Sequence, residues 1–269
     1  MNRAAHELRL AGVALQFLTR VPVRLEDFDP RWLNDSARHF PLVGALIGLF
    51  GAGVLWASAA LWPMPVAVLL SMAATIWLTG GFHEDGLADT CDGLGGAVSR
   101  ERALAIMKDS RLGSYGALGL VLTLGLKAAA LTALAGSSLL LTSASLVLAH
   151  AVSRACAVAL LSTLAYAGDA QHAKARPMAQ PTGYAALVVA IAWAALIAVA
   201  LCLALPAQFG VVRLSSALLC AVAVALVCAG WLRRRLGGYT GDGLGATQQW
   251  TELAVYLALA ALPAGAASA

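Results

Sequence analysis

Three aspartates in the stretch HEDGLADTCDG, residues 83–93, are the side chains best suited to chemistry. Asp85, Asp89 and Asp92 stand at i, i+4 and i+7, so on a helix they share one face. Like charges at this spacing destabilise a helix by about a few tenths of a kcal/mol per pair. A divalent cation would offset that repulsion, and Mg²⁺ commonly joins carboxylates to substrate phosphates. The pattern predicts a magnesium site; the alternative is a solvated acidic turn at a membrane surface.

The surroundings of these aspartates favour a site over a turn. His83 precedes them, and glycines on both sides of the stretch permit close approach of the backbone. A second acidic position, Asp242, lies in the glycine-rich stretch GGYTGDGLGA, residues 237–246. We expect Asp242 to lie on the same side of the membrane and to complete the metal site.

Contacts for phosphate are expected in the stretch MKDSRLGSYG, residues 107–116. Lys108, Ser110 and Arg111 supply a cation, a hydroxyl and a guanidinium just before a glycine-spaced helix start, which suits phosphate oxygens. The same charges would equally serve as a positive cap on a membrane span. Arg154 lies four residues after His150 inside an apolar segment, so it is a candidate anion contact, with a purely structural pair as the alternative.

The elements that must position these residues are membrane-spanning helices. The 269 residues are 60% hydrophobic and 12% charged, whereas soluble domains carry about a quarter charged residues. The apolar runs reach the length of about 20 residues that a bilayer requires. We therefore expect an all-α, polytopic integral membrane protein that forms one domain, 1–269, with about seven transmembrane helices (six to eight). The expected spans are 41–61, 64–82, 116–135, 139–165, 184–206, 211–232 and 251–268.

The basic residues predict the orientation. An amphipathic, basic segment precedes the first span and is expected to lie at the membrane interface. Most of the 18 Lys and Arg residues fall before that span or in the even-numbered connections, which places the N-terminus and the active-site connections, about 83–115 and 233–250, in the cytoplasm. Arg233–Arg235 are interpreted as part of this topology signal. None of the 14 acidic residues is expected well inside a span. Lys127, near the middle of the third span, is not assigned a role; it would snorkel if that span starts later.

The sequence does not support a nucleic-acid-binding protein or a disulfide-stabilised protein. No basic patch is interleaved with aromatic residues, so binding of nucleic acid is not expected. The 5 cysteines have no paired spacing, and four fall within expected spans, so a disulfide framework is not expected either.

Together the stretches HEDGLADTCDGLGG, MKDSRLGSYG, SRACAVALLSTLAYA and GGYTGDGLGA resemble, in order and spacing, the motifs of the cobalamin synthase family. The resemblance runs from FLTRVPV to the last expected span. It implies catalytic roles for His83, Asp85, Asp89 and Asp109, with the general base left open between His83 and the aspartates. It implies substrate contacts for Lys108, Ser110, Arg111 and Arg154, and metal ligands in Asp85, Asp89, Asp92 and Asp242. Glu84 stands where the family often has an apolar residue, so no ligand role is assigned to it.

The activity that the resemblance implies is a Mg²⁺-dependent transfer in the cytoplasmic membrane of a bacterium. The ribose 3′-hydroxyl of α-ribazole, or of its 5′-phosphate, would attack the cobinamide-bound phosphorus of adenosylcobinamide-GDP. GMP would leave, and adenosylcobalamin or its 5′-phosphate would form. Membrane lipid is an expected partner, and the sequence leaves a homo-oligomer open.

Two alternatives remain at the level of sequence. A membrane phosphotransferase that joins a CDP-linked donor to an alcohol also carries spaced aspartates, but its D-G-x-x-A-R core is not met after Asp85 and Gly86. An ion-coupled transporter would place acids near the bilayer midplane, whereas here they are expected at one surface.

Overall fold

The computed structural model describes residues 3–24, 29–96, 98–168 and 182–261. In these residues the secondary structure is helical, with no β-strand and with an isolated β-bridge between Tyr166 and Tyr239. In chain order the helices are α1 (Arg3–Leu18), α2 (Arg31–Ser36), the 3₁₀ helix η1 (Ala37–His39), α3 (Phe40–Ala59), α4 (Met64–Thr79), α5 (Phe82–Gly95), α6 (Arg100–Met107), α7 (Ser114–Ser137), α8 (Leu139–Thr163), α9 (Tyr184–Ala204), α10 (Val211–Leu236) and α11 (Gly241–Ala261). The all-α prediction is confirmed.

Five stretches are long and apolar enough to cross a membrane: the continuous run through α2, η1 and α3, and the helices α7, α8, α9 and α10. The pair α4 and α5 passes the same test together but is bent by 90°, so the described residues give five or six candidate spans. A polytopic membrane protein is thereby confirmed; the count reaches the lower limit of the expected range, six, only if the bent pair is one span, and otherwise falls one short. The expected seventh span, 251–268, overlaps α11, whose carboxyl and amide side chains lower its apolar character; residues 262–268 lie outside the described part of the chain.

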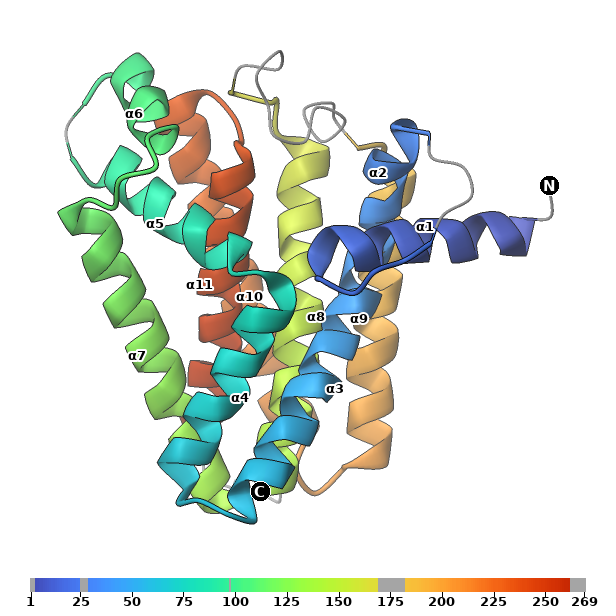
Figure 1. Ribbon diagram of the computed structural model, residues 1–269. Helices are drawn as coiled ribbons and strands as arrows, with labels where there is room; N and C mark the ends of the chain where they lie inside the picture. Colours follow the sequence, from blue (N-terminus) through green and yellow to red (C-terminus); the bar gives the residue numbers. More distant parts are fainter. Residues whose placement is uncertain (1–2, 25–28, 97, 169–181, 262–269) are drawn as a thin grey trace.

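Helix α8 forms the centre of the bundle, with α3 and α11 packed against it (Figure 1). The approach of α3 is close because glycines face α8: a Cβ added at Gly48 would lie 2.6 Å from the carbonyl oxygen of Leu146. Small residues at such contacts let membrane helices pack backbone to backbone. The outer helices α7, α9 and α10 expose leucine and valine side chains, as lipid-facing helices do.

Helix α1 runs across the bundle rather than along it (Figure 1). One side of α1 is buried through Leu10, Val13, Ala14 and Leu18. Its Glu7 accepts a hydrogen bond of 3.1 Å from Arg38 at the start of the α3 run. An amphipathic N-terminal helix is therefore present where the sequence predicted one.

The expected connection 233–250 is mostly helix, which corrects its boundaries. Helix α10 continues to Leu236 and ends at Gly237, whose φ of 81° is left-handed. Helix α11 begins only a few residues later, where the Thr240 hydroxyl accepts a hydrogen bond of 3.0 Å from Gly243 N. Gly237 ends α10 and the Thr240 hydroxyl caps the start of α11, so only a short turn separates the two helices. Asp242 therefore lies in the first turn of α11 rather than in a long loop. Lys174 and Arg176, two of the basic residues in the even-numbered connections, lie outside the described residues.

Candidate functional site

Two consecutive glycines set the direction of the helix that carries the acidic residues. Gly80 and Gly81 separate α4 from α5 with φ angles of 78° and 73°, a left-handed conformation that residues with a side chain rarely adopt. The chain turns by 90° at this point. Helix α5 therefore leaves the direction of the membrane-crossing helices and lies across one end of the bundle, packed on α11 and α7 (Figure 1).

The three aspartates of the first motif lie on α5, as predicted, but they have different surroundings. Asp85 is exposed, whereas Asp89 and Asp92 are half-buried. The two carboxylate oxygens of Asp92 accept hydrogen bonds from the start of α7, from Gly113 N at 2.7 Å and from Gly116 N at 2.8 Å. A carboxylate is favoured there because the first amides of a helix lack partners and carry partial positive charge. In this structure Asp92 joins α7 to α5, and its role as a metal ligand stays a prediction.

Asp242 reaches the same end of the bundle because α11 crosses α5 at a glycine. A Cβ added at Gly86 would lie 2.9 Å from Asp242 Cα and 3.0 Å from its carbonyl oxygen. This backbone contact brings the first turn of α11 beside the turn of α5 that carries Asp85 and Asp89. Within the described residues, however, no three His, Cys, Asp or Glu side chains stand close enough together to hold a metal ion. Asp85, Asp89 and Asp242 therefore lie on neighbouring helix turns but do not form a preformed metal site, and Asp92 is bonded to α7.

The expected phosphate contacts lie at the rim of this end. Lys108 follows α6, and Ser110 and Arg111 are exposed in the segment that leads to α7. The guanidinium of Arg111 donates to Asp109, with 3.0 Å from Nε to Oδ1. Hydrogen bonds from Arg111 lower the pKa of Asp109 to about 2. While Asp109 is paired with Arg111 in this way, it is a weak proton acceptor, and its predicted catalytic role stays a prediction.

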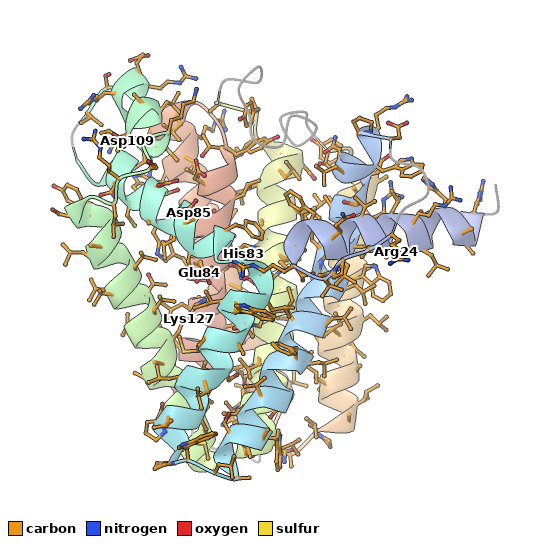
Figure 2. The ribbon with its side chains drawn as sticks, in the orientation of Figure 1. Arg24, His83, Glu84, Asp85, Asp109 and Lys127 are labelled. Atoms are coloured by element: carbon orange, nitrogen blue, oxygen red, sulfur yellow. The ribbon has the colours of Figure 1, made fainter. Side chains whose placement is uncertain are left out.

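His83 and Glu84 face away from the exposed aspartate. His83 is 5% exposed, and its side chain points to the interior together with that of Glu84. Figure 2 shows Asp85 on the side of α5 nearer Asp109, and His83 and Glu84 on the side nearer Lys127. Helix α5 thus separates the predicted catalytic residues into an outer acidic face and an inner face.

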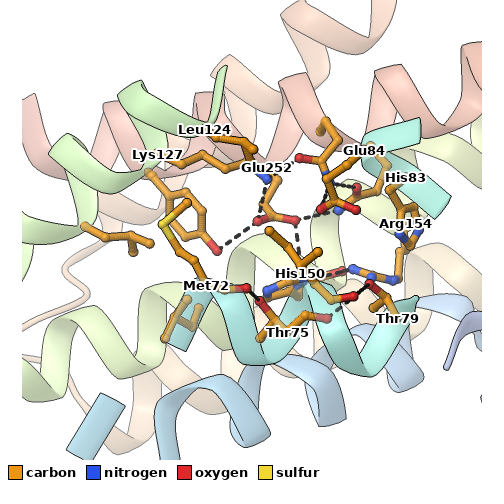
Figure 3. Close-up of a pocket in the computed structure, with 16 residues that line it drawn as sticks. Met72, Thr75, Thr79, His83, Glu84, Leu124, Lys127, His150, Arg154 and Glu252 are labelled. Carbon is orange, nitrogen blue, oxygen red and sulfur yellow. Dashed lines mark hydrogen bonds and ion pairs between the residues drawn. The ribbon is translucent and has the colours of Figure 1, made fainter. Parts of the chain in front are cut away.

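Beneath the inner face lies a set of charged and amide side chains that we call the buried polar cluster. It consists of Glu84, Lys127, Arg154, Gln248, Gln249 and Glu252 (Figure 3). Lys127 Nζ donates to Glu252 Oε1 at 2.8 Å and to Gln249 Oε1 at 2.6 Å. Gln249 Nε2 in turn donates to Glu84 Oε1 at 2.9 Å. These bonds connect α5, α7 and α11 through polar atoms inside an apolar bundle.

Arg154 belongs to this interior and not to the exposed rim. It is 2% exposed, and its Nη1 donates to the carbonyl oxygen of His150 at 2.9 Å and to His150 Nδ1 at 3.1 Å. The predicted pairing of His150 and Arg154 on one helical face is therefore present. A small cavity, lined by His83, Glu84 and Arg154 among others, lies next to the pair.

The sequence did not reveal the buried polar cluster. Glu252 was expected near the start of a span, and Lys127 was not assigned a partner, yet both are 4% exposed and paired with each other. The available signal was the spacing of Gln248 and Glu252, which lie four residues apart and therefore on one face of a helix. Four residues also separate His150 and Arg154, on the helix that packs against α11.

Fold and site together define a polytopic α-helical membrane protein with an acidic site at one end of its bundle. The model of the cobalamin-5-phosphate synthase family matches residues 11–260. The chain belongs to this family, which confirms the resemblance and sets aside the two alternative predictions.

Relatives named adenosylcobinamide-GDP ribazoletransferase align with nearly the whole chain. The protein from Leptothrix cholodnii is 61% identical over 96% of this chain and 97% of its own. The one from Shewanella amazonensis is 45% identical over 96% and 97%, and the one from a Polaromonas species is 44% identical over 97% and 99%. No solved structure matches the chain.

Proposed function

We propose that this chain transfers the cobinamide phosphate group of adenosylcobinamide-GDP to α-ribazole or its 5′-phosphate. The observation that carries the proposal is the near full-length similarity to relatives of that name, 61% for one of them. In the reaction a bond forms between the ribose 3′-oxygen and the cobinamide-bound phosphorus. The anhydride bond to GMP breaks, and the hydroxyl proton passes to a base. The product is the last assembled form of the corrinoid, adenosylcobalamin or its 5′-phosphate.

The acidic end of the bundle suits a diphosphate substrate with Mg²⁺. Asp85 is exposed, and Asp89 and Asp242 lie on helix turns that touch at Gly86. Magnesium is usually held by one or two carboxylates plus phosphate and water oxygens, so it does not need three preformed protein ligands. When bound, the ion would neutralise charge on the phosphoryl oxygens.

Positively charged residues at the rim would bind the diphosphate and orient it. Arg111 is paired with Asp109 in the structure, but both are at the surface, where solvent screening keeps an ion pair weak. A diphosphate carries more charge than one carboxylate, so it would draw Arg111 away from Asp109 at little cost. Lys108 and Ser110 are exposed beside it and would contact further oxygens. The remaining task of the protein is to hold the attacking hydroxyl in line with the phosphorus.

The membrane setting completes the proposal. The excess of Lys and Arg on the side of the acidic site supports a location in the cytoplasmic membrane of a bacterium, with the site and the N-terminus in the cytoplasm. Helix α1 would lie at the lipid interface, and a homo-oligomer stays an open prediction.

The test is GMP release by the purified protein in liposomes with adenosylcobinamide-GDP, α-ribazole 5′-phosphate and Mg²⁺. The same assay is run after chelation, on Asp85→Asn, and on Asp29→Asn as a control. Asp29 is a surface carboxylate beside Arg31, far along the chain from the acidic site. We expect wild type and Asp29→Asn to release GMP and the other two samples to release none. Folded wild type without GMP release would overturn the function, and an active Asp85→Asn would remove Asp85 from the metal site.

A further inference from the structure

Two atoms of the buried polar cluster lack a partner among the described residues: Glu84 Oε2 and Arg154 Nε. Both side chains line the cavity beneath α5, and both atoms are closed off from solvent (Figure 3). An unpaired polar atom in the interior is costly, more so when it belongs to a charged group. The cavity therefore presents one free acceptor and one free donor.

The charges around the cavity argue against an anion as its occupant. Two groups of the cluster are positive, Lys127 and Arg154, and two are negative, Glu84 and Glu252. Lys127 is already held by Glu252 at 2.8 Å. A phosphate oxygen bound to Arg154 Nε would share the cavity with the carboxylate of Glu84, which repels an anion. Arg154, expected from the sequence to contact an anion, lies in a neutral environment that disfavours one.

A hydroxyl group satisfies both atoms, because its oxygen accepts from Arg154 Nε and its proton is donated to Glu84 Oε2. We propose that the cavity is a hydroxyl-binding site between Glu84 and Arg154. Two sources supply this chemistry: a water molecule, which fits a small polar cavity, or a ribose hydroxyl of the acceptor substrate, which would reach the site only if the helices around the cavity move apart. The second source rests on the proposed function, and the first does not.

The proposed hydroxyl site lies directly behind the acidic face of α5, so it could help to position that face for the reaction. Glu84 is the neighbour of Asp85, and its other oxygen, Oε1, is held by Gln249 of α11 at 2.9 Å. A hydroxyl bridging Glu84 to Arg154 would add a tie from α5 to α8. The inner face of α5 would then be fixed on two sides, directly behind the acidic face.

The deciding experiment is a crystal structure of the wild-type chain in lipid, at a resolution that shows ordered water, with and without α-ribazole. We expect density within hydrogen-bond distance of both Glu84 Oε2 and Arg154 Nε. The same density in both maps identifies water, and its replacement by a sugar oxygen identifies the ribose. An empty cavity, direct pairing of the two side chains, or a phosphate at this position would overturn the proposal.

Binding measurements separate the two sources in solution. In Glu84→Gln the amide keeps an oxygen for Gln249 but presents a donor in place of Oε2, so a bound hydroxyl loses its acceptor. If ribose occupies the site, the Kd of α-ribazole measured by calorimetry rises about tenfold or more. Thr79→Val, also at the cavity wall, leaves the Kd unchanged because the Thr79 hydroxyl already donates to Thr75 O at 3.0 Å.

An unchanged Kd in Glu84→Gln assigns the site to water where the map shows one, and it counts against the proposal where the map shows none. If wild type binds α-ribazole but releases no GMP, the proposed function is wrong. The hydroxyl site is not affected by that result, because the electron-density map tests it separately.

Discussion

The ammonium group of Lys127 on α7 lies 2.8 Å from Oε1 of Glu252 on α11, and each side chain is 5% exposed. Tyr256 donates to the same oxygen at 3.2 Å, and Gln249 accepts a second hydrogen bond from Lys127. Charges in the interior of a membrane bundle persist only when they are paired. This pair therefore holds α7 against α11 directly below the acidic end of the molecule.

Removing one partner of this pair should destabilise the protein strongly. Lys127→Met leaves the carboxylate of Glu252 buried without its cation, and we expect a loss of about 3–5 kcal/mol in the free energy of unfolding. Denaturant titration in detergent measures it. The double variant Lys127→Met with Glu252→Gln removes both charges and should recover part of the loss. If the two single changes simply added in the double variant, the pair would not be energetically coupled.

The sequence was sufficient for five of the seven expected spans and for the helix that carries the aspartates. Lipid-facing helices such as α7, α9 and α10 each contain a long apolar stretch, so their lengths can be recognised in the sequence. The three aspartates of α5 follow helical spacing. These features depend on residues near each other in sequence, which is why local patterns predicted them.

The interior of the bundle could not be predicted, because its partners come from different helices. Lys127 and Glu252 are 125 positions apart, and no spacing rule relates them. Arg235 shows the same limit: it was interpreted as part of a topology signal, yet it donates to Leu94 O at 3.3 Å and to Gly96 O at 2.8 Å. The 90° turn between α4 and α5 at Gly80 and Gly81, which directs Glu84 inward, likewise depends on backbone geometry.

The crossing of α5 and α11 should tolerate no side chain at Gly86. A Cβ there would meet Asp242 Cα at 2.9 Å and push the two helices apart, which would separate Asp85 from Asp242. We expect Gly86→Ala to lower the rate of GMP release by about tenfold to a hundredfold. Gly125→Ala on α7 is the matched control, because no atom lies within 4 Å of its added Cβ and alanine favours a helix. A wild-type rate in Gly86→Ala would show that this close contact does not position the site.

The two hydrogen bonds that Asp92 accepts from the start of α7 should be required for activity as well as for stability. Asp92→Asn keeps one acceptor and loses the charge, so we expect a loss of about 1–2 kcal/mol in stability and a large loss in GMP release. Ser138→Ala removes the N-cap of α8, which accepts from Leu141 N at 3.1 Å, at the other end of α7. This control should lose similar stability but keep its activity per folded molecule. If Asp92→Asn and Ser138→Ala had equal activity per folded molecule, Asp92 would act only as a cap of α7 and not in the reaction.

Arg235 should hold the end of α5 in place, whereas its neighbour Arg234 should not. The Arg235 guanidinium donates to the last carbonyls of α5, which have no partner within their own helix. Arg234 is exposed and carries the same charge, so Arg234→Met controls for the charge contributed to membrane topology. In Arg235→Met we expect faster amide hydrogen exchange in residues 89–95 and a lower rate of GMP release, both measured against Arg234→Met. Identical exchange in the two variants would mean that the end of α5 is held by its packing on α6 and α7, and that Arg235 acts only through its charge.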